Sequence, residues 1–387
     1  MQMIRRPAIT RGYLAGVLAA AAVAAALIAA PAAASATASD AASAAMSTAA
    51  QAPASFGGQA SLASISCRGP SWCMAVGAYT TTDHVRHAQA MIWNGTTWRT
   101  LKNPPGKSLT SVSCSAPWFC MAAGGPTGAE RWNGTSWAAM PSPPGGVSGV
   151  SCGSRKLCMV IYQGLVRSWN GTTWHLWKPQ TDFCTGSAPG PCGLDGVSCA
   201  SATNCVTVGT WTQSQEPIQN AVSVYWNGTS WTRDYELPAR GNPAQLNAVS
   251  CTGSFCLATG SSSDDSAGGT VADADTFDAT SQSWTSVPPD LGNLCAEFRA
   301  CYWTAAISCA SPTSCMTLGG PDGSQWWNGT GWASARTISA GRGSALQGLS
   351  CGGSNCLTVG FRTVAGKRRT LAELWNGSAW TIITTPR

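Results

Sequence analysis

The hexapeptide Trp93-Asn94-Gly95-Thr96-Thr97-Trp98 decides the fold, because the chain repeats it along most of its length. Asn-Gly between strand-forming residues is the strongest short-range signal for a β-hairpin, since its tight turn needs backbone conformations that Asn and Gly adopt readily. A two-residue turn would place Trp93 opposite Thr96 and Met91 opposite Trp98, with the two tryptophans in a diagonal pair on one face. Each copy therefore predicts a hairpin that presents two indole rings to a neighbouring layer.

The motif occurs six times, and a seventh, degenerate copy fills the one gap in the series. The flanking aromatic pairs are Trp93/Trp98, Trp132/Trp137, Trp169/Trp174, Trp226/Trp231, Phe277/Trp284, Trp327/Trp332 and Trp375/Trp380. The degenerate copy replaces Trp-Asn-Gly by Phe277-Asp278-Ala279 and is expected to have a longer turn. We expect these pairs to fill the wide outer gaps between packed sheets, because each tryptophan buries about 150–250 Å².

A longer unit surrounds each hairpin. It contains an apolar segment ending in Val-Ser-Cys or a close variant, a short loop, a second cysteine that opens an apolar segment, a variable stretch and the hairpin. The first cysteines of successive units are 47, 38, 47, 52, 58 and 42 residues apart. A period of about 40–50 residues with four short strands is typical of propeller blades. An open β-solenoid would have shorter repeats, so we predict an all-β fold with one seven-bladed β-propeller of four-stranded blades.

The propeller is expected to follow an export signal. Arg5, Arg6 and Arg11 precede an apolar run from about Leu14 to Ala30, and small-residue cleavage sites follow, which is typical of a secretory signal peptide. An uncleaved membrane anchor is the alternative. The predicted organisation is a signal peptide at 1–38, a flexible Ala/Ser/Pro-rich leader at 39–60 and the propeller at 61–387, with blades at about 61–107, 108–145, 146–193, 194–244, 245–304, 305–344 and 345–387.

All 18 cysteines lie in the part expected to be exported. An even number of cysteines at repeated spacing in such a chain indicates disulfides. Seven pairs recur with the unit, namely Cys67/Cys73, Cys114/Cys120, Cys152/Cys158, Cys199/Cys205, Cys251/Cys256, Cys309/Cys315 and Cys351/Cys356, and two further pairs are Cys184/Cys192 and Cys295/Cys301. Metal ligation is the alternative, but zinc sites favour a tighter spacing with more His or Cys nearby. We therefore predict one local disulfide in each blade and no bound metal, and leave the pairing of the two further pairs open.

The disulfides and the aromatic pairs are expected to have different tasks. Each bridge closes a small loop, so the entropy that it removes from the unfolded chain corresponds to only about 2 kcal/mol. The two buried aromatic rings of a blade outweigh this contribution. We therefore expect packing to hold the ring of blades together and the bridges to trim the loops.

Charge and composition exclude some functions. Without the signal peptide the chain has 20 basic and 17 acidic residues, and Lys367-Arg368-Arg369 is its one basic cluster. A nucleic-acid-binding protein would show a denser basic stripe. We expect no nucleic-acid partner, no membrane insertion after cleavage, and a secreted monomer.

Binding is expected on one rim of the propeller. The connections between second and third strands, and between successive blades, share a face and vary in length, and function usually sits on variable loops over a rigid scaffold. The candidate binding residues on this face are Tyr79, His84, His87, Trp211, Asp264, Asp265, Tyr302 and Trp303. On the opposite, uniform face, Trp72 and Trp118 could stack on sugar rings or could instead cover their own disulfide loops.

Two of these stretches could bind a metal ion. His84-x-x-His87, preceded by Asp83, could ligate zinc or copper or supply a general base. Asp264 and Asp265 on a Gly-rich loop could hold calcium, but the spacing does not match an EF-hand loop. Solvated polar loops explain both stretches as well, so no cofactor is expected.

The repeat resembles a known group. Val-Ser-Cys, Cys-x-Ala-Val-Gly and Trp-Asn-Gly-Thr-x-Trp together, over about Leu62 to Arg387, resemble secreted β-propeller repeat proteins of actinobacteria. The hairpin is distantly similar to the Asp-box of sialidase-type propellers and to the kelch hairpin. Those boxes are structural, so the resemblance implies an extracellular propeller and supplies no catalytic residue.

Three functions remain open from the sequence. The first is a non-catalytic scaffold that recognises an extracellular glycan or protein. The second is a polysaccharide hydrolase or lyase with dispersed acidic residues near the central channel, since glycoside hydrolysis needs paired carboxylates. The third is a cell-surface structural module, if the signal run is retained.

Overall fold

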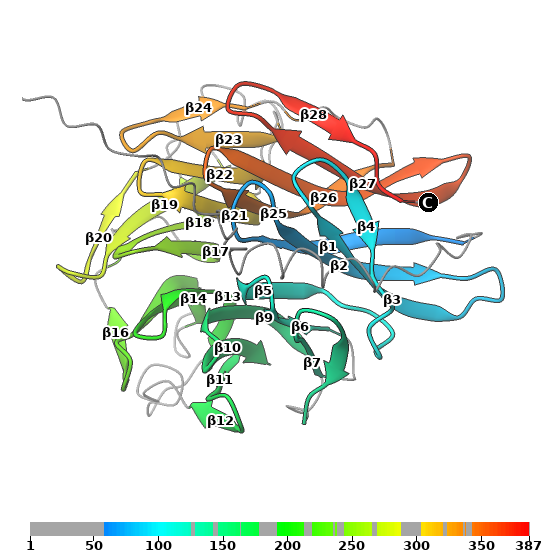
Figure 1. The fold of residues 1–387 in the computed structure, drawn as a ribbon. Helices are drawn as coiled ribbons and strands as arrows, with labels where there is room; N and C mark the ends of the chain where they lie inside the picture. Colours follow the sequence, from blue (N-terminus) through cyan, green and yellow to red (C-terminus); the bar gives the residue numbers. More distant parts are fainter. Residues whose placement is uncertain are drawn as a thin grey trace, which may run out of the picture. The chain divides into compact units, whose positions relative to one another are not determined.

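The computed structural model describes residues 58–124, 128–141, 146–162, 164–177, 192–212, 219–234, 237, 244–264, 269–287, 303–319, 323–335, 337 and 343–386. These residues form 28 β-strands in seven four-stranded sheets and no helix. Every strand pairs antiparallel with the strand that precedes or follows it in the chain (Figure 1). None of the described residues forms a helix with the length and apolarity needed to span a bilayer.

Each blade consists of four consecutive strands, numbered outwards from the centre. Blade 1 has β1 (Ala60–Cys67), β2 (Cys73–Thr80), β3 (Arg86–Trp93) and β4 (Trp98–Thr100). Blade 2 has β5 (Ser111–Ala116), β6 (Phe119–Ala123), β7 (Ala129–Trp132) and β8 (Trp137–Ala139). Blade 3 has β9 (Val147–Ser154), β10 (Leu157–Tyr162), β11 (Leu165–Trp169) and β12 (Trp174–Trp177). Blade 4 has β13 (Cys192–Ser201), β14 (Asn204–Thr212), β15 (Gln219–Trp226) and β16 (Trp231–Asp234).

The remaining three blades follow the same plan. Blade 5 has β17 (Ala244–Thr252), β18 (Phe255–Asp264), β19 (Gly269–Asp278) and β20 (Ser283–Ser286). Blade 6 has β21 (Trp303–Ser311), β22 (Ser314–Gly319), β23 (Ser324–Trp327) and β24 (Trp332–Ser334). Blade 7 has β25 (Ala345–Gly352), β26 (Asn355–Val364), β27 (Lys367–Trp375) and β28 (Trp380–Ile383).

The seven sheets close into a ring. Each innermost strand lies against the innermost strand of the next blade, and β25 lies against β1. The predicted seven-bladed propeller is therefore confirmed. Among the described residues no strand is exchanged between the first and last blades, because each sheet is built from consecutive strands of the chain. In this part of the chain, packing and hydrogen bonds close the ring.

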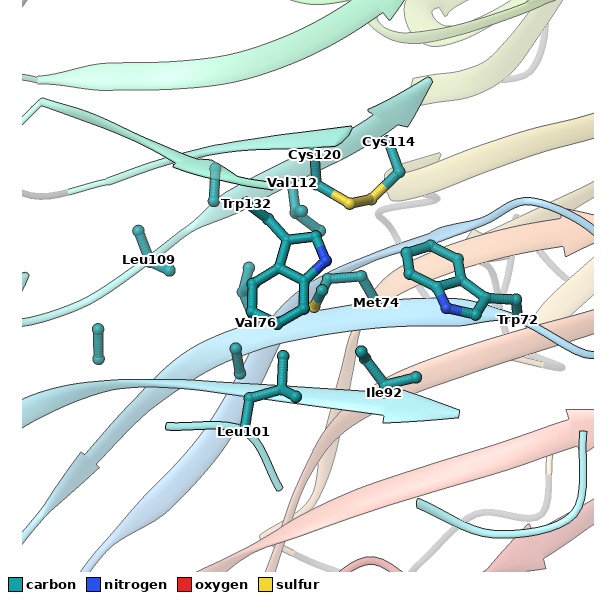
Figure 2. Packing of buried hydrophobic residues seen from close by; sticks show 13 residues of the cluster. Trp72, Met74, Val76, Ile92, Leu101, Leu109, Val112, Cys114, Cys120 and Trp132 are labelled. Atoms are coloured by element: carbon teal, nitrogen blue, oxygen red, sulfur yellow. A yellow bond between two sulfur atoms is a disulfide. The ribbon is translucent and has the colours of Figure 1, made fainter. Parts of the chain in front are cut away.

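The interfaces between blades form the hydrophobic core. Seven clusters of buried residues occur, and each contains the aromatic pair of one blade packed on the middle strands of the blade before it. Between blades 1 and 2, Trp132 lies against Met74 and Val76 beside the Cys114–Cys120 disulfide (Figure 2). Between blades 7 and 1, Trp93 and Trp98 pack on Leu357. Buried aromatic rings therefore fill the gap between blades, as the repeat predicted.

The register of the hairpin differs from the prediction. Trp93 pairs directly with Trp98 across the strands, so the loop has four residues and the rings are a cross-strand pair. The reason lies in Asn94, whose Oδ1 accepts hydrogen bonds from the backbone N–H groups of Thr96 and Thr97 at 3.0 and 2.8 Å. An Asn side chain that bonds the backbone in this way caps a wider turn. Of the predicted Asn-Gly pair, Gly95 alone has positive φ, at 98°.

All seven hairpins have this corrected geometry. In each, the two rings lie directly opposite each other in place of the predicted diagonal arrangement, with centroids 5.0–5.7 Å apart. The pairs are Trp93 with Trp98, Trp132 with Trp137, Trp169 with Trp174, Trp226 with Trp231, Phe277 with Trp284, Trp327 with Trp332 and Trp375 with Trp380.

The degenerate hairpin of blade 5 also departs from the prediction of a longer turn. Its two additional residues lengthen the strands, because Asp278 pairs with Ser283 beyond the pair formed by Phe277 and Trp284. The loop that remains has four residues, as in the other blades. Trp284 is 8% exposed, and its indole N–H donates to the hydroxyl group of Ser223 in blade 4 at 3.0 Å. Trp284 is thus a buried contact between blades 4 and 5.

The seven predicted disulfides within the repeat units are present. Each joins directly opposed cysteines of the first two strands, five or six residues apart in the chain. They are Cys67–Cys73, Cys114–Cys120, Cys152–Cys158, Cys199–Cys205, Cys251–Cys256, Cys309–Cys315 and Cys351–Cys356. The side chains of Cys184, Cys192, Cys295 and Cys301 lie outside the described residues.

The position of these disulfides corrects the expectation that they only trim loops. The second cysteine of each bridge is at most 4% exposed and belongs to a cluster between blades. These buried residues are Cys73, Cys120, Cys158, Cys205, Cys256, Cys315 and Cys356. Their burial follows from pairing, since each lies opposite the first aromatic residue of its hairpin on the third strand. The second cysteine of each bridge is therefore part of the core between blades.

A ring of serine hydroxyls connects the innermost strands. In every blade the serine before the first cysteine accepts a hydrogen bond from the backbone N–H of the equivalent cysteine in the next blade, at 2.8–3.0 Å. The last bond, from Cys67 N–H to Ser350 Oγ at 2.9 Å, joins blade 1 to blade 7. This ring explains the serine of the repeated Val-Ser-Cys.

Candidate binding face

The two faces of the propeller differ in construction. On one face the turn between the first two strands of a blade lies against the tip of its outer hairpin. A Cβ added at Gly134 would lie 3.2 Å from the Cβ of Trp118, and one at Gly171 would lie 3.5 Å from Lys156. Both kinds of turn are short and similar in every blade. We call this side the turn face, and the opposite side, where second and third strands are joined, the loop face.

Several stretches predicted as long loops on the loop face continue as paired strands. In blade 7, pairing runs without interruption from Cys356 opposite Trp375 to Val364 opposite Lys367. In blade 5, β18 and β19 pair out to Asp264 opposite Gly269. Antiparallel strands pair wherever both backbones stay extended, whether or not outer strands flank them. The loop face therefore carries two-stranded ribbons of unequal length.

Two predicted binding residues meet in blade 1. The rings of Tyr79 and His87 stack with centroids 5.2 Å apart, and the phenol oxygen of Tyr79 accepts a hydrogen bond from Asn103 Nδ2 at 2.7 Å. His84 lies at the exposed tip of the same hairpin with φ of 64°. Hydrogen bonds, chiefly from Thr81, lower the pKa of Asp83. Among the described residues no group of three His, Cys, Asp or Glu side chains is placed to hold a metal ion.

The other predicted binding residues that the structure describes lie in other blades. Trp211 is partly buried and packs into the core between blades 3 and 4. Asp264 is the last residue of β18 in blade 5, and Trp303 is the first residue of β21 in blade 6. The side chains of these two residues lie outside the described part of the structure, and so do Asp265 and Tyr302. The candidate residues therefore lie on four separate blades, and their proposed roles stay predictions.

The two tryptophans predicted on the turn face have different environments. Trp72 is 9% exposed and packs into the core between blades 1 and 2, so it does not present its ring to solvent. Trp118 is 56% exposed and lies over the glycine of its own blade's hairpin. Trp72 and Trp118 are therefore not a matched pair of exposed indoles on the turn face.

A ring of bulged residues surrounds the loop-face end of the central channel. Each innermost strand that starts there has an extra residue four positions before its first cysteine, where the pairing register shifts. The flanking residues face the neighbouring blades: Leu62 packs toward blade 7, and Ser64 Oγ accepts a hydrogen bond from Val112 N–H of blade 2. The extra residue belongs to neither face, and bulges of this kind re-aim a side chain.

The residues four positions before the first cysteine are mostly polar. They are the bulge residues Ala63, Ser148, Asp195, Asn247, Ala305 and Gln347, and in blade 2 Thr110, which directly precedes β5 and is not a bulge. Thr110, Ser148, Asp195 and Gln347 are exposed. The channel mouth on the loop face is thus lined by hydroxyl, amide and carboxylate groups that can form hydrogen bonds to a ligand.

Asp195 is the single carboxylate among the described side chains of this ring. Its side chain reaches water, but the surrounding protein limits solvation and raises the pKa of its carboxyl group. Other acidic side chains are held inside the blades. Glu130, Asp275 and Glu373 are each 2% exposed or less and lie two residues before a hairpin aromatic residue on the third strand. The described residues therefore show no two carboxylates facing each other across the channel.

Sequence reasoning missed the bulge ring, although a signal was present. When the seven units are aligned on their first cysteines, the position one before the cysteine is always Ser and the position three before is always small. The position four before ranges from Ala to Asp and Gln. A variable polar position within a uniform strand marks a side chain that packs against neither neighbour.

Comparisons with known proteins show the fold alone. No family model matches the sequence, and no curated protein matches it. Among solved structures, YCF48 from Cyanidioschyzon merolae has 12% identity and a TM-score of 0.50, covering 80% of this chain and 94% of that one. The β-propeller domain of Cps50 (Swd1) from Myceliophteria thermophila has 11% identity and a TM-score of 0.50, covering 81% and 96%. YCF48 bound to D1 peptide has 14% identity and a TM-score of 0.48, covering 79% and 90%. The chain is a β-propeller with distant propeller neighbours.

Proposed function

We propose that this protein is an exported, non-catalytic binding scaffold that recognises an extracellular glycan or protein through its loop face. The observation that carries the proposal is the difference between the two faces. The turn face repeats the same short turns in every blade, whereas the loop face combines ribbons of unequal length with a variable polar ring around the channel. Variation that the fold does not require is expected where a ligand is bound.

Export is supported by the seven disulfides of the repeat units, because such bonds persist in oxidising compartments. The N-terminal sequence of protein recovered from the culture medium would test this part. We expect it to begin after the predicted signal peptide, near residue 39, and recovery of the chain in the cytoplasm alone would refute export.

A non-catalytic role is favoured over the hydrolase alternative by the placement of the acidic groups. Glycoside hydrolysis needs two carboxyl groups about 5–9.5 Å apart across a cleft. Among the described acids, Asp195 is single at the channel mouth, Glu130 and Glu373 are enclosed in the blades, and Asp83 and Asp278 lie at exposed hairpin tips. A polar ring with one carboxylate supports hydrogen-bonded recognition better than bond cleavage.

The test is binding of the purified chain to immobilised polysaccharides and proteins, with one variant on each face. We expect Thr110→Ala/Gln347→Ala at the channel mouth to weaken binding, because both side chains are exposed on the loop face. Trp118→Ser on the turn face serves as the control and is expected to leave binding unchanged. Binding that is lost with Trp118→Ser but retained by the channel-mouth variant would refute the proposal. Release of new reducing ends from a polysaccharide would favour the hydrolase.

A further inference from the structure

One ribbon of blade 7 extends beyond its sheet. The outermost pairings that flank it are Ala345 with Phe361 on one side and Ala372 with Ile383 on the other. Residues 362–369, which we call the cationic ribbon, extend beyond the paired parts of the flanking strands β25 and β28 (Figure 1, orange to red). The ribbon ends in a two-residue turn with φ of 49° at Ala365 and 72° at Gly366, a geometry that follows the twist of a hairpin. The cationic ribbon is therefore a regular β-hairpin that projects beyond the rest of the blade.

The cationic ribbon concentrates positive charge on one of its faces. It contains Arg362, Lys367, Arg368 and Arg369 and no acidic residue. Arg362 lies directly opposite Arg369, and Lys367 lies opposite Val364, so three cationic residues share one face of the ribbon. Like charges directly opposite each other on a sheet are unfavourable. Of the three, Arg369 is half-buried and its guanidinium group donates a hydrogen bond to the backbone oxygen of Gly58 at 3.4 Å, whereas Arg362 and Lys367 are exposed.

The fourth cation of the ribbon is held on the other face. The guanidinium carbon of Arg368 lies 4.2 Å from the centroid of the Phe361 ring, within the range of a cation–π contact. This contact occupies the ring and fixes the guanidinium group. Phe361 is therefore not free to stack on a nucleic-acid base, which is how single strands are commonly bound.

Blade 1 extends the same surface. The side-chain Oε1 of Gln59 accepts a hydrogen bond from Arg368 N–H at 2.6 Å, while its backbone oxygen accepts one from Thr80 N–H at 2.7 Å. Gln59 thereby ties the cationic ribbon to the tip of the β2–β3 hairpin, which carries exposed Arg86 and Asp83.

The net charge of the cationic ribbon with Arg86 and Asp83 equals the net charge of residues 58–387. Residues 58–387 contain 20 Lys and Arg against 16 Asp and Glu, a net charge of +4. The cationic ribbon with Arg86 and Asp83 also has a net charge of +4, so the remainder of the region is neutral in sum. Four of the 20 basic residues of this region are therefore gathered in one eight-residue ribbon next to the junction of blades 7 and 1.

We propose that the cationic ribbon is the docking site for an anionic polysaccharide that carries carboxylate groups on successive units; this deepens the proposed function, on which it rests, by naming the partner class. Arginine guanidinium groups match carboxylates in a two-bond geometry, and three cations along one face fit a chain of charges better than a single ion.

Other polyanions fit less well. The one large apolar side chain exposed on the ribbon is Val364 at the tip, 49% exposed, which is little for insertion into a membrane surface. Charged side chains along an exposed strand edge discourage pairing with an added peptide strand.

The test compares two variants that remove the same charges from opposite faces. Arg362→Gln/Lys367→Gln removes an exposed arginine and an exposed lysine from the cationic ribbon. Arg155→Gln/Lys156→Gln removes an exposed arginine and an exposed lysine from the turn between β9 and β10 on the turn face. Both sites lie at turns or projections outside the core, and thermal unfolding would confirm that both variants fold.

Binding of the full exported chain to polygalacturonate would be measured over a range of salt concentrations, with neutral dextran as the uncharged probe. We expect the ribbon variant to bind about tenfold more weakly and the turn-face variant to change less than twofold, from two lost surface charge contacts. Equal weakening by both variants, or none by the ribbon variant, would overturn the docking site. Tighter binding to DNA, polyglutamate or anionic vesicles than to polygalacturonate would overturn the choice of partner.

The outcome of this experiment can be distinguished from the outcome of the test of the proposed function. If the chain binds a neutral glycan or a protein in a way that needs Thr110 and Gln347 but not the ribbon, the loop-face scaffold stands and the ribbon site fails. If all binding depends on the turn face, both fail.

Discussion

Replacing Trp98 by Ala tests whether indole packing holds the ring closed. Trp98 is 7% exposed and lies in the cluster between blades 7 and 1, where the chain provides no exchanged strand. A tryptophan buries about 150–250 Å², which at about 25 cal/mol per Å² corresponds to roughly 4–6 kcal/mol, and measured Trp→Ala changes in cores are about 3–5 kcal/mol. We expect a loss of about 4 kcal/mol in the free energy of unfolding.

Trp137→Ala is the matched control. Trp137 holds the same position in the hairpin of blade 2 but is only partly buried against its cluster. Neither indole N–H has a hydrogen-bond partner among the described residues, so the comparison isolates packing. We expect Trp137→Ala to cost less than Trp98→Ala, in proportion to its smaller buried area.

Both variants would be unfolded in urea with the disulfides intact and followed by far-ultraviolet circular dichroism, because tryptophan fluorescence changes with the substitution. A second probe must give the same transition before the two free energies are compared. A cost below about 1 kcal/mol for Trp98→Ala, or one no larger than that of Trp137→Ala, would refute the claim that buried indoles close the ring.

Three further changes test individual contacts. Ser350→Ala removes the acceptor for Cys67 N–H at the junction of blades 7 and 1, so urea unfolding should show a loss of about 1 kcal/mol; no loss would mean that the serine ring does not contribute. Burial raises the pKa of Glu130 above its ordinary 4.5, although a hydrogen bond from Gly106 N–H opposes this; stability from this group is therefore highest at low pH and falls as pH rises through the raised pKa. Glu130→Gln keeps an acceptor for Gly106 and should remove this fall in stability as the pH rises above the ordinary pKa of the group, and an unchanged pH profile would contradict the assignment. Gly377→Ala forces Ala to φ near 98° with nothing within 4 Å of the new Cβ, so calorimetry should show a pure strain cost of about 1–2 kcal/mol; a cost near zero would mean that the turn relaxes.

The repeat made the architecture predictable, because several independent signals share one period. The hairpin, the cysteine pair and the apolar segments each recur seven times, and together they indicate strand order, blade count and disulfides. The register of the hairpin was not predictable from turn statistics. It depends on Asn94 bonding to Thr96 and Thr97, and a two-residue and a four-residue loop place the same hexapeptide between the same strands.

The role of the disulfides was predicted only in part, because spacing shows which cysteines pair but not what covers them. Cys158 and Cys205 close short loops as expected, yet each is fully buried between two blades. Their burial depends on the cross-strand partners Trp169 and Trp226 and on the adjacent blade. A local sequence pattern indicates the bond, whereas its packing follows from the closed ring.

The candidate site was harder to predict than the fold for a physical reason. Tyr79 and His87 were selected separately, and they stack because they lie opposite each other on one hairpin. Trp211 was selected as an aromatic residue outside the repeat, but it packs into the core between blades 3 and 4. Whether an indole is exposed depends on the blade beside it, and the spacing of residues within one unit carries no information about that neighbour.

The contacts that close the ring determine which positions can vary from one repeat unit to the next. The hydrogen bond between Ser350 and Cys67 has the same form and length as the bonds at the other six junctions. Closure therefore depends on the residues that face a neighbouring blade, and these are the positions that stay uniform from unit to unit. The exposed bulge residues and the exposed residues of the cationic ribbon are less constrained by the packing between blades. Arg362 and Lys367 share one face of the ribbon, so a ligand there can favour positive charge without disturbing the contacts that close the ring.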